Sequence, residues 1–426
     1  MSGLTRRRLL LGGGLAATGA LALLPWRAAF AAPAARVGIV GGGFGGASLA
    51  RYLRRHDPKL SITLIEREAT YVTCPFSNGV IAGLYPLKDV SFGYGALHAA
   101  TIETIHAEAL RLDPVRKSVT LAGGKTLQFD FLVLAPGIDL MWESIEGYSP
   151  KAAEQMPHAW KAGAQTQLLR RQIEAMPNGG LLVIAVPPMP YRCPPGPYER
   201  ASLIAHYFKQ NKPESKIIIL DSSDAFIKQE LFMEAWNRLY PGMIEWIPGS
   251  KSGKVLRVEA NTMKVFTGFD DYKAAVANII PAQRAAKIAV DAGLDEGTGY
   301  CAIDPASFES RRHRGVYVLG DAAIAGEMPK SGFSANNQAK ACGRAILAAI
   351  AAKPFVPAKL LNICYSFAKP DYAFSIVDGF EVKNGTIQLS FSDHRTTPLD
   401  AGDEEHRLEA ESAHSWYANI TADMFG

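Results

Sequence analysis

Short apolar runs alternate with longer helical patterns along most of the chain. VGIV, from Val37, is followed by a glycine cluster and by a helical pattern over Ala47–Arg55. The next apolar run, SITLIE, begins at Ser61 and ends in Glu66. Strands that alternate with helices of this length predict parallel sheets joined by helical crossovers. The pattern therefore predicts an α/β fold.

The alternation continues further along the chain. LQFDFLVLAPG and GVYVLGDAAIA are expected to form buried strands, and a helical pattern follows the second from about Asn336. NGGLLVIAVPP and SKIIILDSS predict two strands of a second unit, separated by a helix over Ser202–Gln210. The end of the chain combines short strands such as GTIQLSFS with a helix over about Glu404–Met424.

The first unit carries a dinucleotide-binding fingerprint. Gly41, Gly43 and Gly46 form GxGxxG between a predicted strand and a predicted helix. Glu66 ends the next strand, and Arg67, which follows it, is included in the predicted site. In this context the glycines let the backbone approach a pyrophosphate at the helix N-terminus, and the acidic residue binds a ribose. A dinucleotide site is therefore predicted.

Two later strands favour FAD over NAD. One closes on Gly137, and the other ends in Gly320-Asp321 before a helix. In two-domain flavoproteins an aspartate so placed binds the ribityl chain, and the helix N-terminus stabilises negative charge on the reduced ring. With the fingerprint, these segments resemble the FAD domain of the pyridine nucleotide-disulfide reductase superfamily over most of residues 36–350.

The second unit lacks the glycine fingerprint that usually binds NAD(P)H in that superfamily. PPMPYRCPPGPYER stands in its place and sets Cys193 among prolines in a stiff, non-helical loop. Proline rings without N–H groups cannot cradle a pyrophosphate. Ligands of open α/β sheets bind at the C-terminal ends of the strands, and here a cysteine occupies that end. A site without a nucleotide is therefore predicted.

The resemblance implies two Rossmann-like FAD/NAD(P)-type domains of the glutathione-reductase kind and a C-terminal α+β interface domain. The predicted parts are a signal peptide (1–31), an FAD-binding domain (36–149 and 276–353), a second dinucleotide-type domain without a nucleotide site (150–275) and the interface domain (354–426).

The N-terminus has the features of an export signal. Three arginines precede an apolar region of small residues and an Ala29-Phe30-Ala31 cleavage site. The paired arginines resemble a twin-arginine signal, with an ordinary secretory signal as the alternative. Removal of residues 1–31 lowers Lys plus Arg from 45 to 41, equal to Asp plus Glu. The expected product is periplasmic and near neutral, and its charge gives no sign of a nucleic-acid partner.

The cysteines and histidines show no metal-ligand spacing. CxxC and CxxCH are absent from the sequence, so no zinc site is predicted and no c-type haem is expected on this chain. An odd count of five cysteines leaves at least one unpaired. Cys301 and Cys342 are assigned no chemistry, and Cys342 is expected to pack inside a helix.

A closer resemblance covers nearly the whole chain. YVTCPFSNGVIAG, PHAWKAG, RCPPGPYERAS, MPKSGFSANNQAK, LNICYS and SWYANI resemble the flavoprotein subunit of flavocytochrome c sulfide dehydrogenase. The resemblance implies oxidation of hydrogen sulfide to zero-valent sulfur or polysulfide through FAD. It also implies a partner c-type cytochrome, which would carry haem c on the other subunit of a heterodimer.

The same resemblance implies catalytic roles. Cys193 and Cys364 match the family's redox-active disulfide, and Glu199 matches a base that takes the proton from hydrogen sulfide. A proline-braced cysteine at a crevice by itself fits a nucleophile or a reducible disulfide, with a plain stabilising disulfide as the alternative. A carboxylate screened from water fits a base, with an ordinary glutamate at a helix N-terminus as the alternative.

Further cofactor contacts follow from the resemblance. Cys74 matches a thioether attachment to the 8α-methyl of the flavin, with a buried free thiol as the alternative. Pro75 follows it, whereas an aromatic residue often does in the family. Lys330 and Ser331 match the loop before the flavin-facing helix, and Trp416 matches a tryptophan near the ring, with core packing as the alternative.

Two other functions stay open from the sequence. A sulfide:quinone oxidoreductase would need an amphipathic C-terminal anchor and an apolar quinone pocket. The near-neutral charge and the acidic terminal helix argue against that anchor, so no stable membrane insertion is predicted. A redox-regulated activator of a sulfur-oxidising assembly would carry the same motifs.

Overall fold

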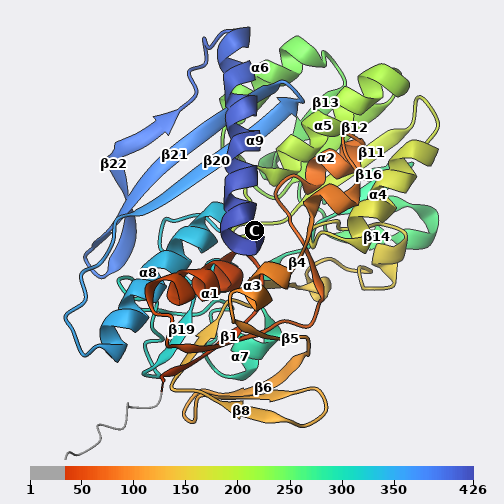
Figure 1. Ribbon diagram of the computed structural model, residues 1–426. Helices are drawn as coiled ribbons and strands as arrows, with labels where there is room; N and C mark the ends of the chain where they lie inside the picture. The colour runs from red at the N-terminus through yellow and green to blue at the C-terminus, as the bar shows by residue number, and fades with distance from the viewer. Residues whose placement is uncertain (1–33) are drawn as a thin grey trace, which may run out of the picture. The chain divides into compact units, whose positions relative to one another are not determined.

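The computed structural model describes residues 34–426, which form one unit. The signal peptide predicted for residues 1–31 lies outside the described residues. The described chain contains two parallel sheets, with helices packed on them, and a C-terminal antiparallel sheet crossed by a long helix (Figure 1). This arrangement confirms the predicted α/β fold class with a C-terminal α+β part.

The first parallel sheet has the strand order β19-β9-β1-β2-β5. Its strands are β1 (Arg36–Val40), β2 (Ser61–Ile65), β5 (Glu103–Ile105), β9 (Phe131–Leu134) and β19 (Val316–Val318). Its helices are α1 (Phe44–His56), α3 (Gly95–Ala99), α7 (Lys287–Asp291) and α8 (Gly332–Ile350), whereas the short helix α2 (Ser77–Ala82) packs on helices of the second sheet. Smaller antiparallel pairings join β3 (Thr70–Val72) to β4 (Ser91–Gly93), β10 (Ile138–Leu140) to β18 (Gln283–Ala285), and β6 (Ala109–Asp113) to β7 (Ser118–Leu121) and β8 (Thr126–Gln128).

The glycine fingerprint lets α1 close tightly on β1. A Cβ on Gly46 would lie 1.8 Å from the carbonyl oxygen of Gly41, and one on Gly41 would lie 2.3 Å from the carbonyl oxygen of Ala135. Gly41 also has a φ of +99°, a conformation that glycine adopts readily. Only glycine fits at both positions, so the turn from strand to helix depends on them.

The second parallel sheet has the order β13-β12-β11-β17. Its strands are β11 (Leu181–Val186), β12 (Lys216–Asp221), β13 (Ile244–Ile247) and β17 (Val276–Ile279), and its helices are α4 (Ala164–Ala175), α5 (Gly196–Asn211) and α6 (Gln229–Leu239). A small antiparallel sheet joins β14 (Arg257–Glu259), β15 (Lys264–Phe266) and β16 (Asp271–Lys273). Since β17 pairs with β11, this sheet extends past the boundary predicted at residue 275.

Alternation along β11 divides the core of the second sheet. Leu182, Ile184 and Val186 lie in one cluster with α5 and α6, whereas Val183 and Ala185 lie in another with β14 and β15. Successive side chains of a strand point to opposite faces, so a continuous apolar run is what a strand buried on both faces requires.

Two helices begin earlier than the sequence pattern predicts. Helix α5 begins at Gly196 rather than Ser202, with Pro197 in its first turn. Proline is tolerated there because the first N–H groups of a helix have no partner within the helix. The predicted non-helical loop is therefore wrong from Gly196 onward. Helix α8 begins at Gly332, before the predicted Asn336.

The C-terminal part is built from long strands rather than the short ones predicted. They are β20 (Leu360–Lys369), β21 (Tyr372–Lys383) and β22 (Thr386–Thr396), in that order in an antiparallel sheet. Helix α9 (Asp403–Phe425) lies across β20 and β21 and ends beside α1 (Figure 1). Met424 and Phe425 join the core of the first parallel sheet.

Asp423 fixes the end of α9 to the first sheet's helices. Its carboxylate accepts hydrogen bonds from Arg55 (2.6 Å) and Asn336 (3.1 Å) and pairs with Lys340 (3.0 Å). Burial alone would raise the pKa of Asp423, but these donors outweigh it and lower the pKa to about 2.

We predict that Asp423→Asn destabilises the protein at pH 7 by about 1–2 kcal/mol. A carboxyl group with a lowered folded-state pKa stabilises the fold above its unfolded pKa and loses that effect as pH falls through the folded value. The difference in urea midpoint from the wild type should therefore shrink between about pH 4 and about pH 2. Asp400→Asn, at an exposed position, is the control and should show no difference. A difference in urea midpoint that stays constant with pH would contradict the assignment of this stabilisation to the Asp423 carboxylate.

Candidate active site

Cys193 lies in the loop between β11 and α5, with a φ of +54°. Its N–H donates to the carbonyl oxygen of Lys330 (2.7 Å), and its own carbonyl accepts from the N–H of Gly196 (2.8 Å). A Cβ on Gly196 would lie only 3.0 Å from the Cys193 sulfur. The loop of the second unit is thus held against the loop that leads into α8 of the first.

The structure brings Cys364 to the same place from β20. Burial raises the pKa of the Cys193 thiol, and the neighbouring Cys364 and Glu199 raise it further. Strand β20 packs on α5 and α6, which places Cys364 near Lys228 and Phe367 near Glu199. Cys193 and Cys364 are neighbours here as two free thiols.

Glu199 lies in the first turn of α5 and is partly buried, so it fits both interpretations, a glutamate at a helix N-terminus and a carboxyl group screened from water. Its carboxylate accepts from the amide of Asn78 (2.7 Å) and from the N–H of Phe367 (3.1 Å). Burial raises the pKa of Glu199, and these hydrogen bonds and the nearby Lys228 oppose the increase only in part. A carboxyl group with a raised pKa beside Cys193 is a stronger proton acceptor than an ordinary carboxylate.

Cys74 and Asp321 meet at the guanidinium group of Arg192. Arg192 donates to the sulfur of Cys74 (3.1 Å) and to the carbonyl oxygen of Trp160, and lies 3.8 Å from the Asp321 carboxylate. Burial lowers the pKa of Arg192, but Cys74 and Asp321 outweigh it and raise the pKa overall.

Arg200 is a second buried cation close to the cysteines. It is 2% exposed and donates to side-chain oxygens of Asn78 and Asn278 and to the carbonyl oxygens of His158 and Ala159. These acceptors are neutral. Burial lowers the pKa of Arg200 to about 10, while Cys74, Cys193 and Glu199 act to raise it.

The predicted FAD residues fit the cofactor. Glu66 accepts from the N–H groups of Gly42 (2.7 Å) and Glu68 (3.0 Å), so its carboxylate is fixed beside the fingerprint. The buried Oδ1 of Asp321 and Nε1 of Trp416 have no hydrogen-bond partner within the described chain. Buried polar atoms are normally paired, so both are suited to groups of a bound ligand.

Other predicted cofactor residues border this region. Gly137 has a φ of +72°, with no atom within 4 Å of a Cβ placed on it, so its surface is open to a ligand. The Lys330 ammonium donates to the carbonyl oxygens of Asp321 (2.9 Å) and Ala323 (2.8 Å), and burial lowers its pKa to about 8. Ser331 caps α8 by accepting from the N–H of Ser334 (3.0 Å).

Two of the predicted cofactor residues form ion pairs, Arg67 and Asp321, and Arg67 has the more exposed side chain. It lies 3.3 Å from Glu68 at the surface, where its side chain is 59% exposed. Cys301 and Cys342 are buried thiols, and burial raises the pKa of Cys301 to about 12. Within residues 34–426, no cluster of side chains suited to a metal ion occurs.

The second sheet fills its own nucleotide crevice with side chains. Asp221, at the end of β12, accepts from the hydroxyl of Tyr198 (2.5 Å) and the indole N–H of Trp246 (3.0 Å). Tyr198 stacks on Phe226 with 3.7 Å between ring centroids. A carboxylate in this position binds the ribose in dinucleotide sites. These contacts favour the prediction that this domain holds no nucleotide.

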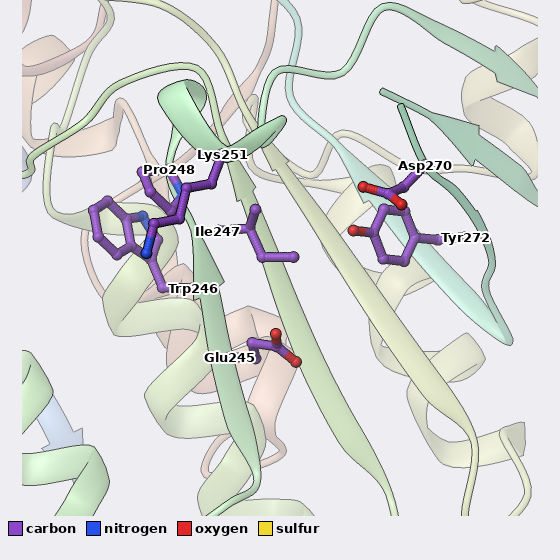
Figure 2. Close-up of a pocket in the computed structure, with 7 residues that line it drawn as sticks. All are labelled: Glu245, Trp246, Ile247, Pro248, Lys251, Asp270 and Tyr272. Atoms are coloured by element: carbon purple, nitrogen blue, oxygen red, sulfur yellow. The ribbon is translucent and has the colours of Figure 1, made fainter. Parts of the chain in front are cut away.

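A surface hollow of about 390 Å³ lies beside β13 (Figure 2). Trp246 and Glu245 border it on the strand, and Asp270 and Tyr272 border it on the facing side (Figure 2). None of the cysteines or predicted cofactor residues lines it. The chemistry of this chain is therefore assigned to the buried cysteine site and not to this hollow.

Parts of the chain match three protein-family models. Residues 166–281 match the central model of the sulfide dehydrogenase [flavocytochrome c] flavoprotein chain, and residues 356–425 match the flavin-binding model of flavocytochrome c sulphide dehydrogenase. Residues 35–174 match the pyridine nucleotide-disulphide oxidoreductase model. The flavoprotein chain of the Chlorobaculum thiosulfatiphilum sulfide dehydrogenase is 64% identical over 45 residues, which are 11% of this chain and 94% of that relative.

The chain belongs to this flavocytochrome c sulfide dehydrogenase flavoprotein family. It is therefore an oxidoreductase with FAD as its cofactor, in agreement with the prediction.

Sulfide-quinone reductases are also similar to the chain. The enzyme of Aquifex aeolicus is 30% identical over 177 residues, which are 41% of this chain and 39% of that relative. The solved structure of the sulfide:quinone oxidoreductase from the same organism has a TM-score of 0.72 at 19% identity and covers 92% of each chain. That likeness shows the shared fold.

Several residues of the site carry no motif of their own in the sequence. Arg192 adjoins Cys193, and a basic residue beside a reactive cysteine is a signal that could have identified it. Lys228 and Arg200 meet their partners only through contacts between distant segments, so nothing in their local sequence marks them.

Proposed function

We propose that this flavoprotein oxidises hydrogen sulfide through a Cys193–Cys364 disulfide. The observation that carries the proposal is the meeting of two thiols and a buried carboxyl group, Glu199, beside the residues that fit FAD. In the oxidised enzyme the two neighbouring sulfurs would be joined. Hydrosulfide would open this bond by thiol–disulfide exchange, which forms a persulfide and a thiolate. Zero-valent sulfur or polysulfide would be the product.

FAD would be held by Glu66, Asp321 and Trp416, with Lys330 and the N-terminus of α8 beside it. When bound, it accepts the two electrons that leave the sulfur. The work of this chain is to position the sulfurs, to accept a proton at Glu199 and to keep water away from both.

Cys74 is the proposed attachment point for the flavin. The guanidinium of Arg192 donates to its sulfur at 3.1 Å and so holds the sulfur beside Asp321, one of the residues that fit FAD. Cys74 precedes the short helix α2, whose Asn78 binds Glu199. The attachment site and the proton acceptor are thus coupled through one short segment.

A c-type cytochrome is the proposed electron acceptor, and the periplasm, reached by the N-terminal export signal, is the proposed location. The family match supports the cytochrome partner. Across residues 34–426 the helices are too short or too polar to cross a membrane. The first turn of α9 carries Asp403, Glu404 and Glu405.

Replacing Cys193 by serine should abolish the bleaching of the flavin by anaerobic sulfide, because no disulfide can then form. Cys364→Ser should behave in the same way, and Cys301→Ala should bleach as the wild type does. Bleaching of Cys193→Ser at the normal rate would refute the disulfide step.

In turnover, ferricytochrome c should be reduced and a soluble quinone analogue should not. Faster reduction of the quinone than of the cytochrome would favour the sulfide:quinone alternative.

Glu199→Gln should slow sulfide-dependent bleaching by about 10²- to 10⁴-fold, the usual contribution of a general base. Because the pKa of Glu199 is raised, the wild-type rate should increase with pH above the usual carboxyl range, where the group loses its proton. The ionisation of hydrogen sulfide affects both proteins equally, so the ratio of the two rates isolates Glu199. A ratio of the two rates that does not change with pH would argue against Glu199 as the general base. Glu214→Gln, at an exposed position, serves as the control.

Precipitation in acid should leave the flavin with the polypeptide in the wild type and release it from Cys74→Ser. The reason is that only a covalent bond survives unfolding. Flavin absorbance in the pellet and the supernatant measures the outcome, and Cys193→Ser is the control that should keep its flavin. Release from the wild type would show that Cys74 forms no thioether.

A further inference from the structure

Lys228 is a buried cation whose hydrogen-bond partners are all neutral. It is 8% exposed, and its ammonium donates to the carbonyl oxygen of Cys364 (2.6 Å) and the hydroxyl of Ser366 (2.8 Å). It lies 3.6 Å from the sulfur of Cys364 and 5.6 Å from the ring centroid of Phe374. Among the ion pairs of the described residues, none includes Lys228. A buried charge is costly unless an opposite charge accompanies it.

The backbone of Lys228 is also held in an uncommon conformation. It has a φ of +63° at the N-cap of α6, although it is not a glycine. Non-glycine residues adopt this left-handed conformation at a cost, and such positions cluster at functional sites. The N–H of Phe232 donates to the Lys228 carbonyl, so the backbone starts the helix while the side chain reaches β20.

The two cysteines differ in their surroundings. Burial, Cys364 and Glu199 all raise the pKa of the Cys193 thiol, and Arg192, which opposes them, is already engaged by Cys74 and Asp321. Cys364 instead has the Lys228 ammonium beside its sulfur. Cys364 therefore has a neighbouring cation that hydrogen-bonds to no other sulfur, whereas Arg192 is shared between Cys74 and Asp321.

We propose that Lys228 makes Cys364 the leaving thiolate when hydrosulfide opens the disulfide, so that the substrate sulfur is first bound to Cys193. The inference rests on the proposed function above. Hydrosulfide attacks the Cys193 sulfur and forms a new S–S bond, the Cys193–Cys364 bond breaks, and its electron pair stays on Cys364 beside Lys228. The proton of the resulting persulfide passes to Glu199. The sulfur with the more stable thiolate leaves faster in such an exchange.

Alkylation of the reduced protein with iodoacetamide tests this directly, since the thiolate is the form that reacts. Mass spectrometry of the peptides gives the rate at each cysteine as a function of pH. In Lys228→Met, the midpoint of the Cys364 profile should move up by about 1 to 3 pH units, the usual effect of losing an opposite charge nearby. The Cys193 profile should change less, and Lys228→Arg should restore the Cys364 profile. An unchanged Cys364 profile in Lys228→Met would overturn the proposal.

Lys212→Met is the matched control. Lys212 also donates to backbone carbonyls, those of Glu174 (2.9 Å) and Met176, but it contacts no cysteine. Loss of Lys212 should affect stability without moving the Cys364 alkylation profile. If Lys212→Met shifted that profile as far as Lys228→Met does, Lys228 would act only through the stability of the fold. Glu199 and Cys193 are the other titratable groups that interact with this cluster. The Glu199→Gln profile is therefore recorded in parallel.

The position of the substrate sulfur provides a second readout. After one equivalent of sulfide and immediate alkylation, the trapped persulfide should lie on Cys193 in the wild type and be shared with Cys364 in Lys228→Met. A wild-type persulfide on Cys364 would overturn the proposal. If bleaching persists in Cys193→Ser, the proposed function fails, and the alkylation profile of Cys364 still decides the role of Lys228, because it requires no turnover.

Discussion

Buried positive charge around the cysteines is the constraint on which the chemistry of this chain depends. Arg192, Arg200, Lys228 and Lys330 all lie within the protein, and their hydrogen bonds go mainly to carbonyl, amide and sulfur atoms. Their pairing with carboxylates is incomplete, so the site favours any group that becomes negative inside it. Thiolates, hydrosulfide and a reduced flavin all fit that description. The same charge that makes the site costly to fold makes it suited to anionic sulfur chemistry.

The fold meets this constraint by bringing together segments that are distant in sequence. The Cys193 loop comes from the second sheet, Lys330 from the first, and Cys364 from the C-terminal sheet. One hydrogen bond, from the Cys193 N–H to the Lys330 carbonyl, joins the first two. Helix α5 connects the Cys193 loop to the C-terminal sheet, because Glu199 on α5 accepts from the N–H of Phe367 on β20. The C-terminal part is therefore needed to complete the site and not only to form an interface.

Whether a feature could be predicted from the sequence depends on how far apart its residues lie along the chain. The glycine fingerprint and Glu66 are close in the chain and were predicted, as was the α/β class, because strand and helix periodicity are local. The start of α5 was missed because prolines normally oppose helices, except in the first turn. Lys228 meets Cys364 across 136 residues, and Arg200 meets Asn78 across 122. No local pattern encodes such contacts, so the electrostatics of the site became visible only in the fold.

The second sheet keeps the framework of a dinucleotide-type domain but places side chains where a ribose would bind. Its parallel strands keep the crevice at their C-terminal ends, but Tyr198, Trp246 and Asp221 now bond one another inside it. Tyr198 and Glu199 are adjacent on α5, so one helical turn both closes the former ribose position and supplies the buried carboxyl group. In the proposed function, the same turn would therefore both exclude a nucleotide and provide the proton acceptor. Cys193, the reacting group in that proposal, lies in the loop after β11, at the end of the sheet where open α/β folds bind their ligands.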